Sequence, residues 1–197
     1  MQAQAAVSPL DARFPLFLGS VYAAYGDFAN AAVAFQKAHE LSPKKQTIYF
    51  QLGQNEWARG DNAAALRHFQ AAYELAPTFD DPQVYFAAAA IRAGQDALAQ
   101  EPLQKLLLSD KAADMRILAA YDARGQLYKV IPLWSAHIKA KPDDIQAYFT
   151  LAAIYYKTGD SAQAIATLQA AARVSPEVSA QAESLITQIR NGTATVN

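Results

Sequence analysis

The sequence predicts an all-α solenoid of about five helix–turn–helix units followed by a closing helix. Three observations support this prediction: glycines recur at a nearly constant interval, prolines recur with the same period, and the apolar residues between them follow helical spacing. Alanine dominates the apolar fraction, which favours helices, and the long runs of Val, Ile and Thr that are typical of strands are absent. The glycines fall at intervals of 34, 34, 31 and 34 residues: Gly26, Gly60, Gly94, Gly125 and Gly159.

Each of these glycines is expected in the turn between the two helices of a unit, where glycine adopts the left-handed conformation without steric cost. Asp27, Asp61 and Asp160 follow directly and are placed to cap the second helix. Prolines then end the second helices, because proline cannot continue a helix. Two pairs of these prolines are 34 residues apart: Pro43 with Pro77, and Pro142 with Pro176.

One unit is three residues short, since Gly94 and Gly125 are only 31 residues apart and the proline that should end this unit is missing. The deletion is expected to shorten the second helix of the third unit or its exit turn. It is interpreted either as a tolerated change of length or as a change in superhelix pitch that shapes the middle of the groove.

The residues within each unit follow a fixed order when Ala12, Gln46, Asp80, Lys111 and Ile145 are taken as first positions. Position 8 is small in four units, position 11 is tyrosine in three, position 20 is alanine in four, and position 24 is aromatic or leucine in all five. This pattern resembles the tetratricopeptide-repeat (TPR) family over residues 12 to 190, closely in units one, two and five and more loosely in units three and four. The resemblance implies a right-handed α-solenoid.

The repeat register divides the chain into an N-terminal extension, a solenoid and a tail. The extension is residues 1–11, and the tail, residues 192–197, is expected to be disordered. After Pro176, an apolar stripe with a polar opposite face predicts a capping helix over residues 178–191, because a terminal repeat needs a polar outer surface. The five units are residues 12–45, 46–79, 80–110, 111–144 and 145–177.

Composition excludes several classes of function. The net charge is −1 and the Lys and Arg residues are scattered, whereas a nucleic-acid-binding protein needs a basic stripe. The absence of cysteine excludes disulfides, thiolate catalysis and cysteine metal sites. No stretch approaches the roughly 20 apolar residues of a membrane span, and Met1–Gln4 does not resemble a signal peptide. We therefore expect a cytoplasmic chain without direct membrane insertion, or else the soluble extramembrane domain of a bacterial inner-membrane protein.

The titratable residues do not form a pattern that is typical of catalysis or metal binding. His39, His68 and His137 have no histidine partner at helical spacing, and His137, at a position usually held by alanine, is expected to be half-buried. The acidic pairs Asp80–Asp81 and Asp143–Asp144 lie where first helices begin, where the helix dipole favours negative charge. Glycine-rich phosphate loops and nucleophile elbows are absent. We predict a chain that is not an enzyme, with no cofactor and no metal.

The resemblance implies that the first helix of each unit lines a concave groove that binds a protein or peptide partner. Aromatic, apolar and cationic residues flank the small residues of position 9, which suits an amphipathic helix or an extended apolar peptide. The positions where related domains clamp a chaperone's terminal carboxylate hold Leu16, Ser20, Gln54, Asp81 and Tyr85 here, so that clamp is missing. The predicted partner-binding residues are Phe50, Gln54, Trp57, Tyr85, Ala88, Ile91, Arg92, Met115, Arg116, Phe149, Tyr156 and Lys157.

Trp57 has two interpretations, because its neighbour Glu56 occupies position 11, where a buried aromatic residue is expected. Either Glu56 is an exposed departure from the pattern and Trp57 reaches the groove, which we favour, or the helix rotates and Trp57 replaces the missing tyrosine.

The predicted function is a non-catalytic scaffold that binds a protein or peptide partner through its concave groove. A first alternative is a soluble accessory domain of a larger membrane-bound glycan ligase or polymerase. Three segments, Arg13–Phe35, Leu41–Gln46 and Tyr148–Asp160, resemble repeats that follow the membrane spans of O-antigen ligase-like or polymerase-like proteins. A second alternative is a structural module that associates with itself to form a homo-oligomer.

Overall fold

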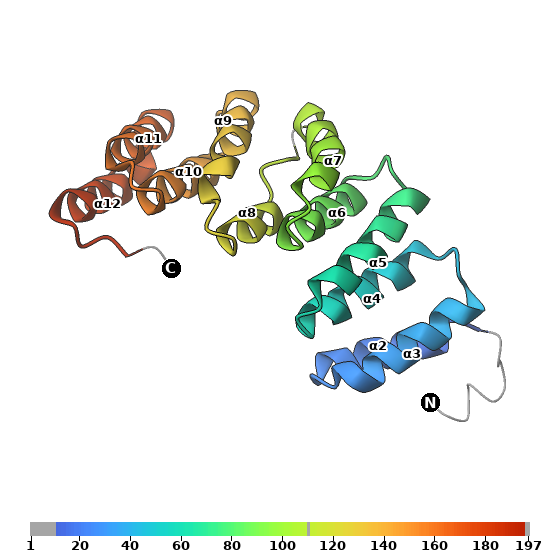
Figure 1. Cartoon of the computed structure of the whole chain (residues 1–197). Helices are drawn as coiled ribbons and strands as arrows, with labels where there is room; N and C mark the ends of the chain where they lie inside the picture. The colour runs from blue at the N-terminus through green and yellow to red at the C-terminus, as the bar shows by residue number, and fades with distance from the viewer. Residues whose placement is uncertain (1–10, 110, 196–197) are drawn as a thin grey trace. The chain divides into compact units, whose positions relative to one another are not determined.

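The computed structural model describes residues 11–109 and 111–195, and every regular element within these ranges is helical. Eleven α-helices follow one another in pairs along this part of the chain, as Figure 1 shows, which confirms the all-α repeat prediction. The chain divides into two compact units, Met1–Pro102 and Leu103–Asn197, and the division falls inside helix α7. Each unit is therefore described by itself.

The N-terminal unit is built from helix hairpins that pack on one another. The hairpins α2–α3 and α4–α5 each place a first helix against a second helix, and α6 then packs on α5. Six helices contribute to this unit, the last of them in part: α2 (Arg13–Ala24), α3 (Phe28–Leu41), α4 (Gln46–Ala58), α5 (Asn62–Leu75), α6 (Asp80–Arg92) and α7 (Asp96–Leu108).

The C-terminal unit repeats the hairpin arrangement and ends in a single helix. The pair α10–α11 packs as a hairpin, and α12 packs against α11. Its elements after α7 are α8 (Met115–Asp122), a short 3-10 turn (Leu127–Val130), α9 (Ile131–Ala140), α10 (Ile145–Lys157), α11 (Ser161–Val174), a second 3-10 turn (Pro176–Val178) and α12 (Ser179–Asn191).

The turns within the hairpins have the predicted chemistry. Gly60 has a φ of 82°, in the left-handed region, and the other four periodic glycines adopt the same conformation. The Asp61 carboxylate, which follows directly, accepts a hydrogen bond of 2.8 Å from the backbone N–H of Ala64 and so caps α5. Asp27 and Asp160 cap α3 and α11 in the same way. The predicted caps are therefore confirmed.

Small residues at position 8 let the two helices of a hairpin approach closely. A Cβ atom added at Gly53 would lie 2.7 Å from the ring of Phe69, and one added at Gly19 would lie 2.4 Å from the ring of Phe35. Both phenylalanines are fully buried. The large residue at position 24 thus fills the space that the missing side chain at position 8 leaves.

The three-residue deletion does not lie where the sequence placed it. The second helix of the third unit, α7, has 13 residues, nearly the length of the 14-residue α5. The first helix of the fourth unit, α8, has only 8 residues, whereas α4, α6 and α10 have 13 each. The prediction of a shortened α7 or exit turn is therefore wrong. The carboxylate of Asp114 accepts a hydrogen bond of 2.8 Å from the N–H of Arg116, which caps α8 and starts it late.

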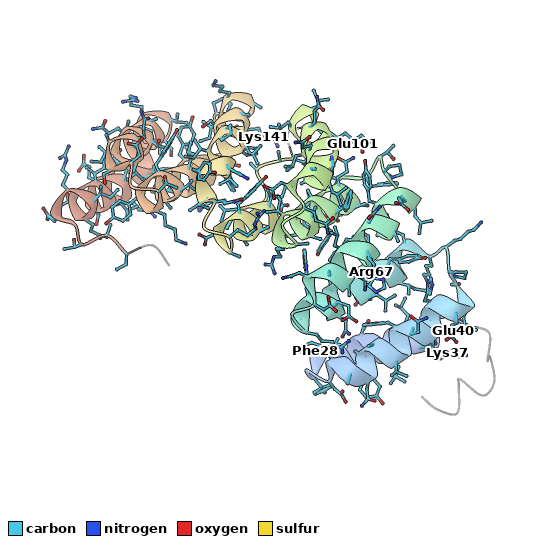
Figure 2. All side chains as sticks on the ribbon, in the orientation of Figure 1. Phe28, Lys37, Glu40, Arg67, Glu101 and Lys141 are labelled. Atoms are coloured by element: carbon cyan, nitrogen blue, oxygen red, sulfur yellow. The ribbon has the colours of Figure 1, made fainter. Side chains whose placement is uncertain are left out.

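Charged side chains occupy the outer faces of the second helices in the N-terminal unit. Lys37 and Glu40 on α3, Arg67 on α5 and Glu101 on α7 are all exposed, and Figure 2 labels them. The Nζ atom of Lys37 lies 3.0 Å from a carboxylate oxygen of Glu40. These faces are typical of a solvated surface, so an apolar binding surface has to be sought on the first helices.

Candidate partner-binding surfaces

Four aromatic rings from three helices gather on the N-terminal unit. Phe50 and Trp57 come from α4, Phe69 from α5 and Tyr85 from α6. The ring of Phe69 is fully buried, and its centroid lies 4.5 Å from that of Trp57 and 5.0 Å from that of Tyr85. Phe50, Trp57 and Tyr85 remain partly exposed around it. The second helix therefore supplies the base on which the rings of two first helices rest.

Two polar groups complete this surface. The side-chain amide of Gln54 donates a hydrogen bond of 3.0 Å to the hydroxyl of Tyr85. The guanidinium of Arg92 lies over the indole of Trp57, 4.9 Å from the ring centroid, a geometry in which the cation is attracted to the ring face. We call Phe50, Gln54, Trp57, Tyr85 and Arg92 the aromatic patch. All five were predicted from the sequence as partner-binding residues, and the structure brings them together.

Trp57 and its neighbour Glu56 fit neither interpretation offered from the sequence. Glu56 is only 9% exposed, so it is not an exposed departure from the repeat pattern. Its carboxylate lies 3.0 Å from the guanidinium of Arg59, one turn later, and this partner compensates the burial of the charge. Because the pair satisfies Glu56 in the position of the missing tyrosine, α4 does not rotate, and Trp57 remains at the partly exposed surface.

Two predicted groove residues of the N-terminal unit do not reach the surface. Ala88 and Ile91 are fully buried, as are their neighbours on α6 from Ala87 to Ala90. A run of alanines lets other elements approach the helix backbone closely on all sides, so α6 is covered all round at this point. The prediction of surface contacts for Ala88 and Ile91 is therefore corrected.

A cavity of about 330 Å³ lies between α8 and α10 of the C-terminal unit. Met115 and Leu118 of α8 and Phe149 of α10 form its apolar walls. At one end, the ammonium of Lys157 lies 2.8 Å from a carboxylate oxygen of Asp122, which ties the two helices together. The structure thus places three predicted residues, Met115, Phe149 and Lys157, around one cavity.

A second cavity of about 240 Å³ continues along α10 toward α12. It shares Phe149 and Ala153 with the first cavity, and we call the two together the α10 groove. Tyr156, another predicted residue, lines this second part. Arg116 is not among the lining residues of either cavity, and its guanidinium lies 2.8 Å from the carboxylate of Asp114.

Sequence reasoning missed several residues of the α10 groove. Leu185 and Ile189 of α12 form one wall of the second cavity, although the sequence showed them only as the apolar stripe of a capping helix. Ala194 and Thr195, which also line it, follow α12 in the tail that the sequence predicts to be disordered. The structure gives residues 192–195 a defined path, while residues 196 and 197 lie outside the described part.

The histidines are spread over separate environments. The Nε2 atom of His137, expected to be half-buried and with 12% of its side chain exposed, lies 2.8 Å from a carboxylate oxygen of Asp144. This hydrogen bond lowers the pKa of Asp144, which also caps α10. Burial lowers the pKa of His68, and His39 packs edge-on against Tyr49. In the part of the chain that the structure describes, no group of three or more His, Asp or Glu side chains is arranged to hold a metal ion.

None of the described helices combines the length and the apolar character that a membrane crossing requires.

Comparison with known proteins points to one family of repeats. The family model described as tetratricopeptide repeat matches residues 46–79 and 145–178. A search of curated proteins found no match.

Solved structures of repeat proteins resemble this chain over most of its length. A tetratricopeptide repeat protein from Parabacteroides merdae has a TM-score of 0.66 at 16% identity, covering 97% of this chain and 76% of that one. The MamA protein has a TM-score of 0.62 at 19% identity, covering 86% of this chain and 94% of that one. YrrB, described as a TPR protein with an unusual peptide-binding site, has a TM-score of 0.59 at 17% identity, covering 93% and 97%. At these identities the likeness is one of fold.

Proposed function

We propose that this chain, which carries tetratricopeptide repeats, is a non-catalytic scaffold that binds a peptide segment of a partner protein through the α10 groove. The observation that carries the proposal is the groove itself: two adjoining cavities along one face of α10, sharing Phe149 and Ala153. YrrB, a protein of the same fold, is described as having a peptide-binding site, which supports a peptide as the ligand class.

The chemistry of the groove favours an apolar anchor side chain. Met115, Leu118 and Phe149 offer carbon surface, and volumes of about 330 and 240 Å³ suit individual side chains better than a large cofactor. The Lys157–Asp122 ion pair at one end offers a donor and an acceptor to a peptide backbone. A partner segment with one or two apolar side chains and no bulky charge fits this surface.

The aromatic patch supplies a second contact surface on the N-terminal unit. Tryptophan, tyrosine and arginine are the residues that most often dominate binding energy at protein interfaces. Here Trp57, Tyr85 and Arg92 are held in place by ring packing and by the cation over the indole, so little side-chain freedom is lost on binding.

The scaffold assignment also fits the titratable groups, whose arrangements serve the fold. The contact between His137 and Asp144 joins the end of α9 to the start of α10, and Glu56 with Arg59 satisfies a buried position of α4. Neither pair lines the α10 groove.

The test is a plug in the groove. Peptides selected from a displayed random library against the full chain would be titrated by fluorescence anisotropy against Ala153→Phe, which fills the wall shared by both cavities. Ala166→Phe, at an exposed alanine of α11, makes the same chemical change outside the groove. We expect Ala153→Phe to weaken binding about tenfold or more, the scale of a lost hot-spot contact, while the control binds as the unmodified chain does. Equal binding by both folded variants would refute the groove as the site.

A further inference from the structure

We infer that the segment following α12, residues 192–195, occupies part of the α10 groove and competes there with a partner peptide. The inference rests on the proposed function, because competition requires that the partner uses the same groove. It assigns an occupant to the second cavity of the groove, and that occupant belongs to the chain itself.

The path of the segment is set at the end of α12. Gly192 has a φ of 67°, a left-handed conformation that glycine adopts without steric cost. The N–H of Thr193 then donates a hydrogen bond of 2.9 Å to the carbonyl of Gln188, which closes the helix end. The chain therefore turns back, and Figure 1 shows its red trace leaving α12 on the side of α10.

A contact between distant parts of the sequence holds the segment in the groove. The hydroxyl of Tyr156 on α10 donates a hydrogen bond of 3.4 Å to the carbonyl of Ala194, which lies 38 residues further along the chain. Ala194 is partly buried, and with Thr195 it lines the cavity that Phe149, Leu185 and Ile189 also line. The groove thus already contacts an extended backbone, as it would contact a peptide ligand.

The same contacts make the segment a weak occupant. Its side chains are small, its hydrogen bond to α10 is long, and about 240 Å³ of space remains beside Ala194. A partner with a larger apolar side chain at this position would fill the space and bind better. The covalent link partly offsets this weakness, because a tethered segment acts at an effective concentration in the millimolar range. A partner's apparent affinity is then reduced by the fraction of molecules with the groove occupied.

The sequence contains no cysteine, so a single introduced thiol can report on the groove. We would compare the maleimide labelling rate of Ala153→Cys in the full chain with that in a chain ending at Asn191. Ala119→Cys is the matched control, because Ala119 holds the same position 9 on α8 and does not line the second cavity. Circular dichroism would check that each variant is folded.

Removal of the segment is expected to raise the labelling rate of Ala153→Cys about threefold or more, since labelling follows the unoccupied fraction. The control rate should not change, and Ala194→Leu in the full chain should slow the labelling of Ala153→Cys further. Equal rates for Ala153→Cys with and without the segment would overturn the inference.

Peptide titration of the two chain lengths separates this inference from the proposed function. Tighter binding by the shortened chain supports competition. Equal binding by both lengths refutes competition while the groove remains the peptide site. A protected thiol in a chain whose groove binds no library peptide would refute the proposed function, and competition with it, and would leave only an intramolecular contact.

Discussion

Gly53 is the position where a single methyl group tests the packing beneath the aromatic patch. In Gly53→Ala the new Cβ would lie 2.7 Å from the ring of Phe69, whereas ordinary contacts begin at 3.4 Å, so the ring must move by about 0.7 Å. The ring is fully buried and has Trp57 and Tyr85 as neighbours at 4.5 and 5.0 Å between centroids, which leaves it little room to move.

Two opposing effects decide the magnitude. Alanine is more favourable than glycine in the middle of a helix by about 1 kcal/mol, whereas overpacking a core costs about 1–3 kcal/mol. Because the confined ring cannot move aside at low cost, we expect a net loss of about 1–2 kcal/mol in the free energy of unfolding. Ala152 and Leu168 make the corresponding pair in the C-terminal unit, and both are buried. Adding Phe69→Leu to Gly53→Ala reproduces that pair.

The assay is urea unfolding followed by far-ultraviolet circular dichroism for the unmodified chain, both single variants and the double variant. We expect the double variant to be more stable than the sum of the single effects predicts, with a coupling of about 1 kcal/mol, because leucine removes the clash with the new methyl group. An unchanged slope of the transition would show that the same unfolding reaction is measured. A Gly53→Ala variant that is more stable than the unmodified chain would refute the reasoning, since helix propensity alone would then explain the result.

Two further predictions concern helix starts. Asp61→Ala should lower the free energy of unfolding by about 1 kcal/mol, because the N–H of Ala64 loses its cap, while Asp61→Asn should cost less; thermal unfolding measures both, and equal effects would contradict the capping role. The hydrogen bond from His137 lowers the pKa of Asp144 in the folded state, so its stabilisation is complete above the ordinary aspartate pKa and is lost as the pH falls through the lowered folded value. Melting temperatures at pH 7 and pH 3 should therefore differ less in Asp144→Asn than in the unmodified chain, and an identical difference would contradict this contribution.

Regular features of the chain followed from local chemistry and could be predicted. Gly60 with Asp61 marks a turn and a cap wherever it occurs, because backbone conformation and hydrogen bonding at a helix end depend on adjacent residues. Gly53 and Phe69 indicate a close helix pair through size alone. The aromatic patch was also predictable, because α4 and α6 repeat the same register and bring equivalent faces together.

Exposure within the first helices could not be predicted in the same way. Ala88 and Ala153 hold the same position 9 in their units, yet Ala88 is fully buried and Ala153 lines the groove. Their difference comes from what packs around each helix, which no property of the residue itself records. Glu56 likewise departed from the pattern at a buried position because Arg59 stands close enough to neutralise it.

The amino-acid sequence was sufficient to establish the repeat, its period, the helix pairs and their caps, because each depends on interactions between residues a few positions apart. The place of the deletion, the shape of the α10 groove and the path of the tail required the folded chain. Removing three residues leaves the same count whether α7 or α8 is shortened, and the cap at Asp114 determines which. The tail lies in the groove because of Tyr156, 38 residues earlier, and contacts at that separation exist only once α10 and α12 have packed around α11.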